Sequence, residues 1–171
     1  MSTIQYLLLT VIALVVIIFS TLPFWDCNDK VEMTESCIFC DIIAGKKPET
    51  NIVKETSEFV IFEDIRPTSK YHFLAVTKRH IESVKVLTKN DIDMIRRMET
   101  GLKQYYTSRG IDNNDAIFGF HQPPAISVKH LHMHGIAPKS TMSFINRLVF
   151  KSGTFWFKTV EEQIRAINEK A

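Results

Sequence analysis

The sequence predicts an α+β domain with a mainly antiparallel sheet of about five strands and two or three helices, preceded by one transmembrane helix. Short stretches rich in β-branched and aromatic residues alternate with turn residues, and one long amphipathic stretch lies between them. The N-terminus is a long, mostly apolar run without charged residues. We therefore expect a membrane anchor at 1–25, a polar linker at 26–36 and a folded domain at 37–171.

The anchor is expected because no charged side chain precedes Asp26. A helix over Ile4–Phe24 would span roughly 30 Å, the thickness of the hydrocarbon core. A cleaved signal peptide is the alternative, but the run has no preceding Lys or Arg and no small-residue cleavage pattern. The nearest positive charges, Lys30, Lys46 and Lys47, lie on its C-terminal side. They predict a single-pass membrane protein with the folded domain facing the cytosol.

Composition excludes several classes of function. The net charge is +2 with 23% charged residues, which gives no basis for expecting a nucleic-acid partner. The three cysteines, Cys27, Cys37 and Cys40, are too few and odd in number for a disulfide framework. They fit a reducing compartment better.

The first half of the folded domain should hold one short helix and three strands. The helix is expected at Ile38–Ala44, where Gly45 can supply the left-handed stop. Pro67 indicates a turn before the last of these strands. The strands are expected at Asn51–Glu55, Glu58–Glu63 and Tyr71–Thr77.

The second half begins with the longest helix, expected at Asp91–Ser108 because apolar residues recur there every three or four positions. Two further strands are expected at Asp115–His121 and Ser127–Ala137. A last helix should begin after Thr159, which forms a capping-box pattern with Glu162.

Three histidines alternate in the last predicted strand. On an extended strand His130, His132 and His134 would project to one side, with successive rings about 7 Å apart. Neutral imidazole is a nucleophile and protonated imidazole is a hydrogen-bond donor, so such a row suits reactions at phosphorus. A metal-binding or merely polar strand surface is the alternative.

Three stretches, CIFCDIIAGKKP, FEDIRPTSKYHFLAVTKRH and SVKHLHMHGIAP, carry a family resemblance. Together they resemble the histidine-triad (HIT) superfamily, specifically its Hint branch and the third animal subtype, with Gly135 departing from the usual apolar residue. The resemblance implies a HIT-like fold and an adenosine 5'-monophosphoramidase activity, the hydrolysis of purine nucleoside phosphoramidates such as AMP-amines.

The resemblance also implies catalytic roles. His132 would attack phosphorus and form a covalent nucleotidyl-histidine, and His134 would bind phosphate oxygens. Ser127 would help protonate the departing amine, and His72 would support the triad.

Nucleotide binding would fall to Asp64 and Ile65 together with His132 and His134. Taken alone, Asp64 would be interpreted as a turn-capping residue before Pro67, and only the resemblance favours ribose binding. The segment GFHQPPA at 119–125 departs from the family pattern, and its prolines remove backbone donors. We expect His121 in this segment to be a solvated loop residue, although it could enter the site.

A structural zinc site is also implied, formed by Cys37, Cys40, His80 and His130. No cofactor would be needed for the chemistry itself. The alternative is two reduced cysteines packed as small apolar residues.

Other functions stay open at this point: a dinucleoside polyphosphate hydrolase, or a non-catalytic nucleotide-binding or zinc-binding interaction module. A homodimer is open as well. The aromatic-rich stretch Phe144–Phe157 could form a contact surface, but core packing is the default expectation.

Overall fold

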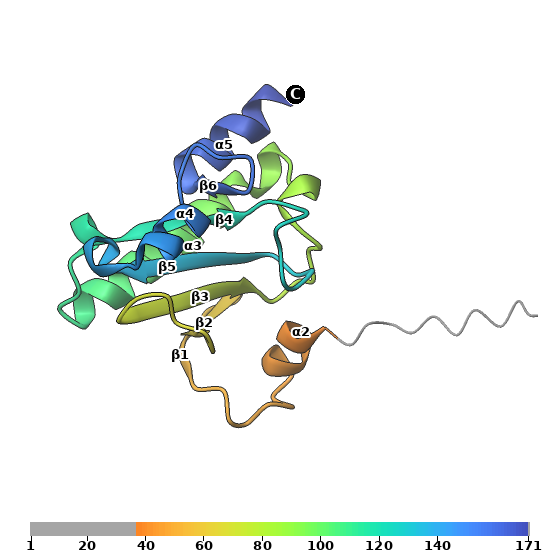
Figure 1. The fold of residues 1–171 in the computed structure, drawn as a ribbon. Coiled ribbons are helices and arrows are strands. Elements are labelled where there is room, and N and C mark those ends of the chain that lie inside the picture. Colours follow the sequence, from red (N-terminus) through yellow and green to blue (C-terminus); the bar gives the residue numbers. More distant parts are fainter. Residues whose placement is uncertain (1–36, 171) are drawn as a thin grey trace, which may run out of the picture. The chain divides into compact units, whose positions relative to one another are not determined.

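The computed structural model describes residues 37–170, which belong to one compact unit (Figure 1). Six strands form a single sheet in the order β1-β2-β3-β5-β4-β6, and every neighbouring pair is antiparallel. The strands are β1 (Ile52–Glu55), β2 (Phe59–Glu63), β3 (Tyr71–Thr77), β4 (Ile117–His121), β5 (His132–Ala137) and β6 (Phe157–Thr159).

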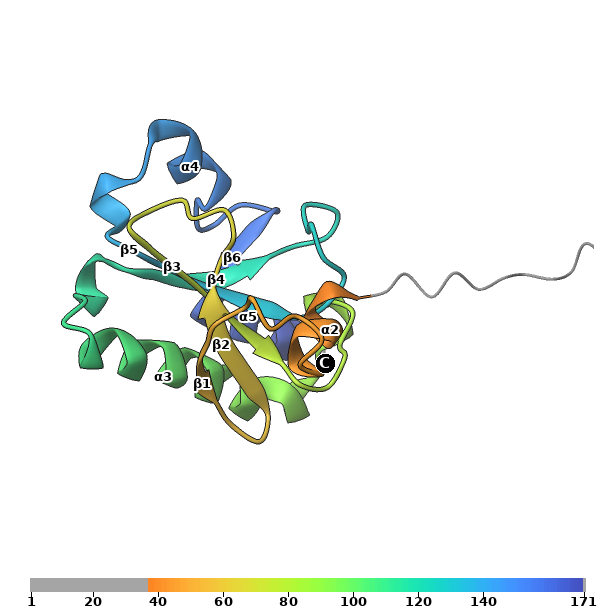
Figure 2. The same cartoon turned by 90° about the horizontal axis from the view of Figure 1, so that it is seen from below.

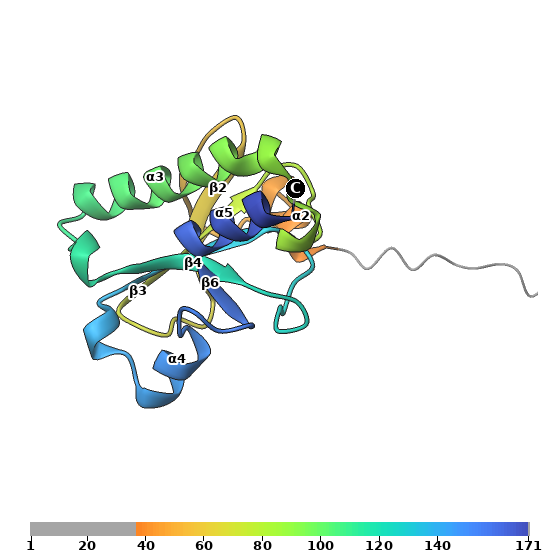
Figure 3. The same ribbon diagram turned by 90° about the horizontal axis from the view of Figure 1, so that it is seen from above.

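Helices cover both faces of this sheet. They are α2 (Ile38–Ile43), α3 (Ile92–Ser108), α4 (Phe144–Val149) and α5 (Val160–Glu169). Helices α3 and α5 lie together on one face and α4 lies on the other (Figure 3). Helix α2 packs Phe39 and Ile42 on the same face as α4, and the two helices occupy separate places on it (Figure 2).

Strand β5 separates the core from the histidines. Met133 and Ala137 face α3 and join the main hydrophobic core, whereas His132 and His134 alternate with them and face the opposite way. A Cβ atom on Gly135 would lie 3.1 Å from the Tyr106 hydroxyl oxygen. The departure of Gly135 from the family pattern therefore leaves room for α3 to pack closely on β5.

The predicted α+β class and antiparallel sheet are confirmed, but four details were wrong. The strand expected over Ser127–Ala137 is formed only from His132 onward. Strand β6 and helix α4 were missed. In the stretch expected to be core, Phe150 and Phe157 are buried, but Phe144 and Phe155 are 77% and 76% exposed.

The expected membrane localisation is not supported. Within residues 37–170, no helix combines the length and apolar character needed to cross a bilayer. The longest, α3, has one apolar face and one charged face, as expected for a helix that covers a sheet. This finding contradicts the predicted single-pass localisation. The anchor expected at 1–25 lies outside the described residues.

Candidate active site

A cavity of about 530 Å³ opens on the histidine-bearing face of the sheet. Strands β3, β4 and β5 form its floor, and the end of α4 with the segment after it forms one wall. We call it the histidine cavity. Its lining includes Asp64, Arg66, Thr68, His72, His121, Ser127, His132, His134, Asn146, Leu148, Val149, Phe150 and Trp156.

His132 is held in one tautomer. Its Nδ1 atom lies 2.6 Å from the backbone carbonyl oxygen of His130, so the Nδ1–H donates to that oxygen. The ring is buried, and loss of hydration lowers its pKa below the ordinary value. Neutral His132 therefore keeps an unprotonated Nε2, the form that a nucleophile requires.

The position of the ring proton on His134 follows from the tautomer of His72. The backbone N–H of Thr68 donates to Nδ1 of His72 at 3.3 Å, so the proton of neutral His72 is on Nε2. That Nε2–H donates to Nδ1 of His134 at 2.9 Å. His134 must then carry its own proton on Nε2, a buried atom with no partner among the described residues. A buried donor without a partner is rare and indicates a ligand acceptor.

The two carboxylate oxygens of Asp64 make different contacts. Its Oδ1 accepts the backbone N–H of Arg66 at 2.8 Å, which is the turn-capping contact. Its Oδ2 lies 3.4 Å from Nε2 of His72, and the side chain lines the cavity. Ile65, expected beside Asp64 in the nucleotide pocket, is 94% exposed and does not line the cavity.

His121 belongs to the cavity, so its expected place in a solvated loop was wrong. It is the last residue of β4, and its ring centroid lies 5.0 Å from that of His134. Its Nδ1 lies 3.1 Å from the carbonyl oxygen of Trp156. Phe150, which the sequence did not single out, packs against the rings of His72, His121 and His134 at 4.9 to 5.7 Å.

The predicted spacing of the triad rings was also wrong. The ring centroids of His132 and His134 are 4.9 Å apart, closer than the 7 Å expected along an extended strand. His130 precedes β5 and directs its ring away from the cavity, toward α2. Only two of the three triad rings therefore line the cavity, and His72 and His121 complete the group.

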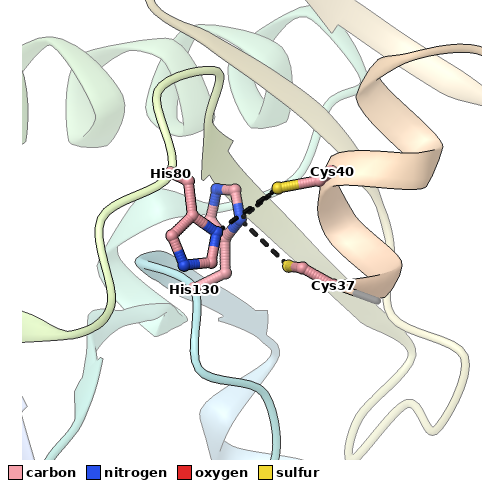
Figure 4. A group of neighbouring side chains, drawn as sticks. All are labelled: Cys37, Cys40, His80 and His130. Atoms are coloured by element: carbon pink, nitrogen blue, oxygen red, sulfur yellow. Dashed lines mark hydrogen bonds between the residues drawn. The ribbon is translucent and has the colours of Figure 1, made fainter. Parts of the chain in front are cut away.

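The four residues expected to bind zinc lie together (Figure 4). In this thiol–histidine cluster, Nδ1 of His130 is 3.3 Å from Sγ of Cys37 and 3.5 Å from Sγ of Cys40. Nδ1 of His80 is 3.3 Å from Sγ of Cys40. The ligands of a tetrahedral zinc ion are separated by about 3.5 Å when their bonds have the usual lengths, so the cluster has suitable dimensions.

The proton positions also suit a metal ion. Nε2 of His130 lies 2.6 Å from the carbonyl oxygen of Thr77, so the Nε2–H donates there and the lone pair on Nδ1 faces the sulfur atoms. A second group, Asp64, His72 and His134, is equally compact. There, ligation through Nε2 of His72 would move its proton to Nδ1, against the N–H of Thr68. We therefore interpret the second group as a hydrogen-bond chain.

Comparisons with known proteins agree with this geometry. A family profile described as "Scavenger mRNA decapping enzyme C-term binding" matches residues 36–149. The chain is 39% identical over 128 residues to "Adenosine 5'-monophosphoramidase HINT3" of Mus musculus, over 74% of this chain and 78% of that protein. It is 36% identical over 130 residues to the protein of the same name in Xenopus tropicalis, over 75% and 85%.

A solved structure titled "HIT family hydrolase from Clostridium thermocellum Cth-393" is also similar. It is 26% identical, has a TM-score of 0.55, and aligns with 60% of this chain and 90% of its own. The chain belongs to the histidine-triad family. The family resemblance stated from the sequence is thus confirmed, and the histidine-triad fold accounts for the two cavity-facing rings on β5.

Proposed function

We propose that the protein hydrolyses nucleoside phosphoramidates, with AMP-amines as the first substrates to test. One observation carries the proposal: a buried His132 whose Nδ1 proton is bound by a carbonyl, which leaves Nε2 as a base inside the cavity. The names of the mouse and frog relatives support the same reaction. The bond cleaved is the P–N bond of the phosphoramidate.

The reaction has two steps. Nε2 of His132 attacks phosphorus, the P–N bond breaks, and the nitrogen leaves with the bonding electrons. The departing amine takes a proton from solvent, relayed through the hydroxyl of Ser127, which lines the cavity. Water then attacks the nucleotidyl-histidine, which releases AMP, returns His132 to its neutral form and restores the proton to solvent.

His134 stabilises the charge that develops during both steps. Its Nε2–H is buried and lacks an acceptor among the described residues. A phosphate oxygen can therefore accept this N–H without the loss of an existing hydrogen bond. His72 keeps this donor in place. His121 adds a second imidazole beside His134 at the same phosphate.

The nucleoside would extend toward the turn that contains Asp64. A carboxylate can accept hydrogen bonds from two ribose hydroxyls, and Oδ2 of Asp64 faces the cavity side of the turn. Ile65 has its side chain free to pack on a base. Selectivity for purines is part of this proposal.

Zinc is proposed as a structural ion held by Cys37, Cys40, His80 and His130. A tetrahedral site with four protein ligands would cross-link α2 to the segments after β3 and before β5. It would leave His132 and His134 free for the reaction.

The experiment that tests the function measures amine release from adenosine phosphoramidates by the full chain. We expect turnover by the wild type and none by His132→Ala, with a labelled AMP adduct trapped on His132. Asp41→Asn, a change of an α2 side chain outside the cavity, is the matched control. Turnover by His132→Ala would refute the proposal. Binding of AMP without turnover by the wild type would instead indicate a non-catalytic nucleotide-binding module.

A further inference from the structure

His130 contacts both the thiol–histidine cluster and the nucleophile His132, through different groups. Its ring belongs to the thiol–histidine cluster, with Nδ1 3.3 Å from Sγ of Cys37. Its backbone carbonyl oxygen accepts the Nδ1–H of His132 at 2.6 Å. One residue therefore connects the metal-binding geometry to the acceptor that fixes the nucleophile's tautomer.

The regular sheet does not hold this carbonyl. Strand β5 begins only at His132, and the N–H of His130 bonds locally to the carbonyl oxygen of Val128 at 2.9 Å. The ring of His130 is anchored more firmly: Nε2–H donates to Thr77, and Nδ1 faces two sulfur atoms. The peptide that carries this carbonyl is also held by the N–H of Leu131, which donates to the carbonyl oxygen of Ile81 at 2.7 Å. The direction of the carbonyl thus depends on what holds the ring of His130 and on the segment that carries His80 and Ile81.

Helix α2 provides a second connection. Phe39 lies between the two cysteines in the sequence, and its ring packs edge-on against His130 and His132 at centroid distances of 5.9 and 5.2 Å. Any bond that fastens Cys37 and Cys40 to His130 also fixes this aromatic contact with His132.

We propose that the thiol–histidine cluster, when it holds a zinc ion, positions His132 by fixing the carbonyl of His130 and the ring of Phe39. The inference extends the proposed function. The effect would be geometric, because two thiolates neutralise the charge of a divalent cation and leave little field at the cavity. His80 contributes only through the cluster, since it is exposed and does not line the histidine cavity.

The first test follows the ring nitrogens of His132 by ¹⁵N NMR in the full chain. Zinc-loaded wild type should show a single tautomer with the proton on Nδ1. Metal-free wild type prepared by chelation, and the His80→Ala variant with its zinc loss confirmed by metal analysis, should show a mixture of tautomers. Asp41→Asn, on the same helix, should match the wild type. An unchanged single tautomer in both metal-free samples would overturn the inference.

The second test separates kcat from KM. His80→Ala should lower kcat by about tenfold, as is typical when an outer-shell contact is lost, with KM unchanged. An equal kcat in His80→Ala and wild type would also count against the inference. Should the wild type prove to have no turnover, the proposed function fails, and the NMR measurement still decides whether the cluster positions His132.

Discussion

The Nε2 atom of His72 lies 2.9 Å from the Nδ1 atom of His134, and the two residues come from adjacent strands. The backbone N–H of Thr68 places the proton of His72 on Nε2. Through the bond between the two rings, this in turn places the proton of His134 on the Nε2 atom that faces the cavity. The chemistry proposed for His134 therefore depends on a residue that never needs to touch the substrate.

Replacement of His72 should expose this dependence. His72→Phe keeps the ring volume but leaves Nδ1 of His134 without its donor, so we expect kcat to fall on the order of 100-fold through misplacement of the phosphate contact. His72→Gln can donate an amide N–H to the same atom and should recover part of the loss. Steady-state kinetics on an AMP-amine checks both. Equal kcat values in the two variants would show that His72 acts only through packing.

The stability of the protein should decrease in mild acid. Burial lowers the pKa of His72 from 6.5 to about 4, and it lowers that of His134 well below the same ordinary value. Between about pH 4 and 6.5 the unfolded chain binds more protons than the folded one, so the free energy of unfolding falls as the pH falls. Urea denaturation at several pH values measures this slope, which His72→Phe should reduce. A slope of opposite sign would contradict the burial of neutral rings.

Two substitutions of Asp64 separate its contacts. Asp64→Asn retains an oxygen that can accept the N–H of Arg66 but loses the negative charge, so we expect KM for the AMP-amine to rise about tenfold with little change in stability. Asp64→Ala also loses the turn contact and should cost about 1 kcal/mol in the free energy of unfolding. Kinetics and thermal denaturation together distinguish the two. An unchanged KM in Asp64→Asn would place the ribose elsewhere.

His121→Phe tests the histidine at the end of β4. Phenylalanine preserves the packing against Phe150 and Phe157 but removes both ring nitrogens. We expect kcat to fall about tenfold, as for the loss of a moderate electrostatic contact. The carbonyl oxygen of Trp156 still accepts the N–H of Gln122 at 2.9 Å, so we expect little change in stability. A variant with full activity would show that His121 is only part of the cavity wall.

Local pattern was sufficient to predict much of the fold. Helix α3 and strands β1 to β3 follow apolar periodicity, and they appear within one residue of the expected bounds. The capping box at Thr159 is formed, with the Glu162 carboxylate accepting the N–H of Thr159 at 2.8 Å. These features depend on neighbours in the sequence, which is why sequence reasoning found them.

Register and irregular backbone could not be predicted in the same way. His121 shares the cavity face because Gly119 pairs with His134 across β4 and β5, and no local signal gives that pairing. Helix α4 escaped notice because it has only six residues, too few for apolar periodicity to distinguish a helix. His130 left the expected strand because its N–H bonds to Val128.

The alternation along β5 has a consequence for how this family can change over time. Residues that hold the domain together point to α3, and residues that line the histidine cavity point the other way. Selection can therefore alter the reactive side while folding stays nearly constant. An ancestor with this strand could acquire a new leaving group or a new nucleotide through a few substitutions, without first acquiring surplus stability to tolerate them.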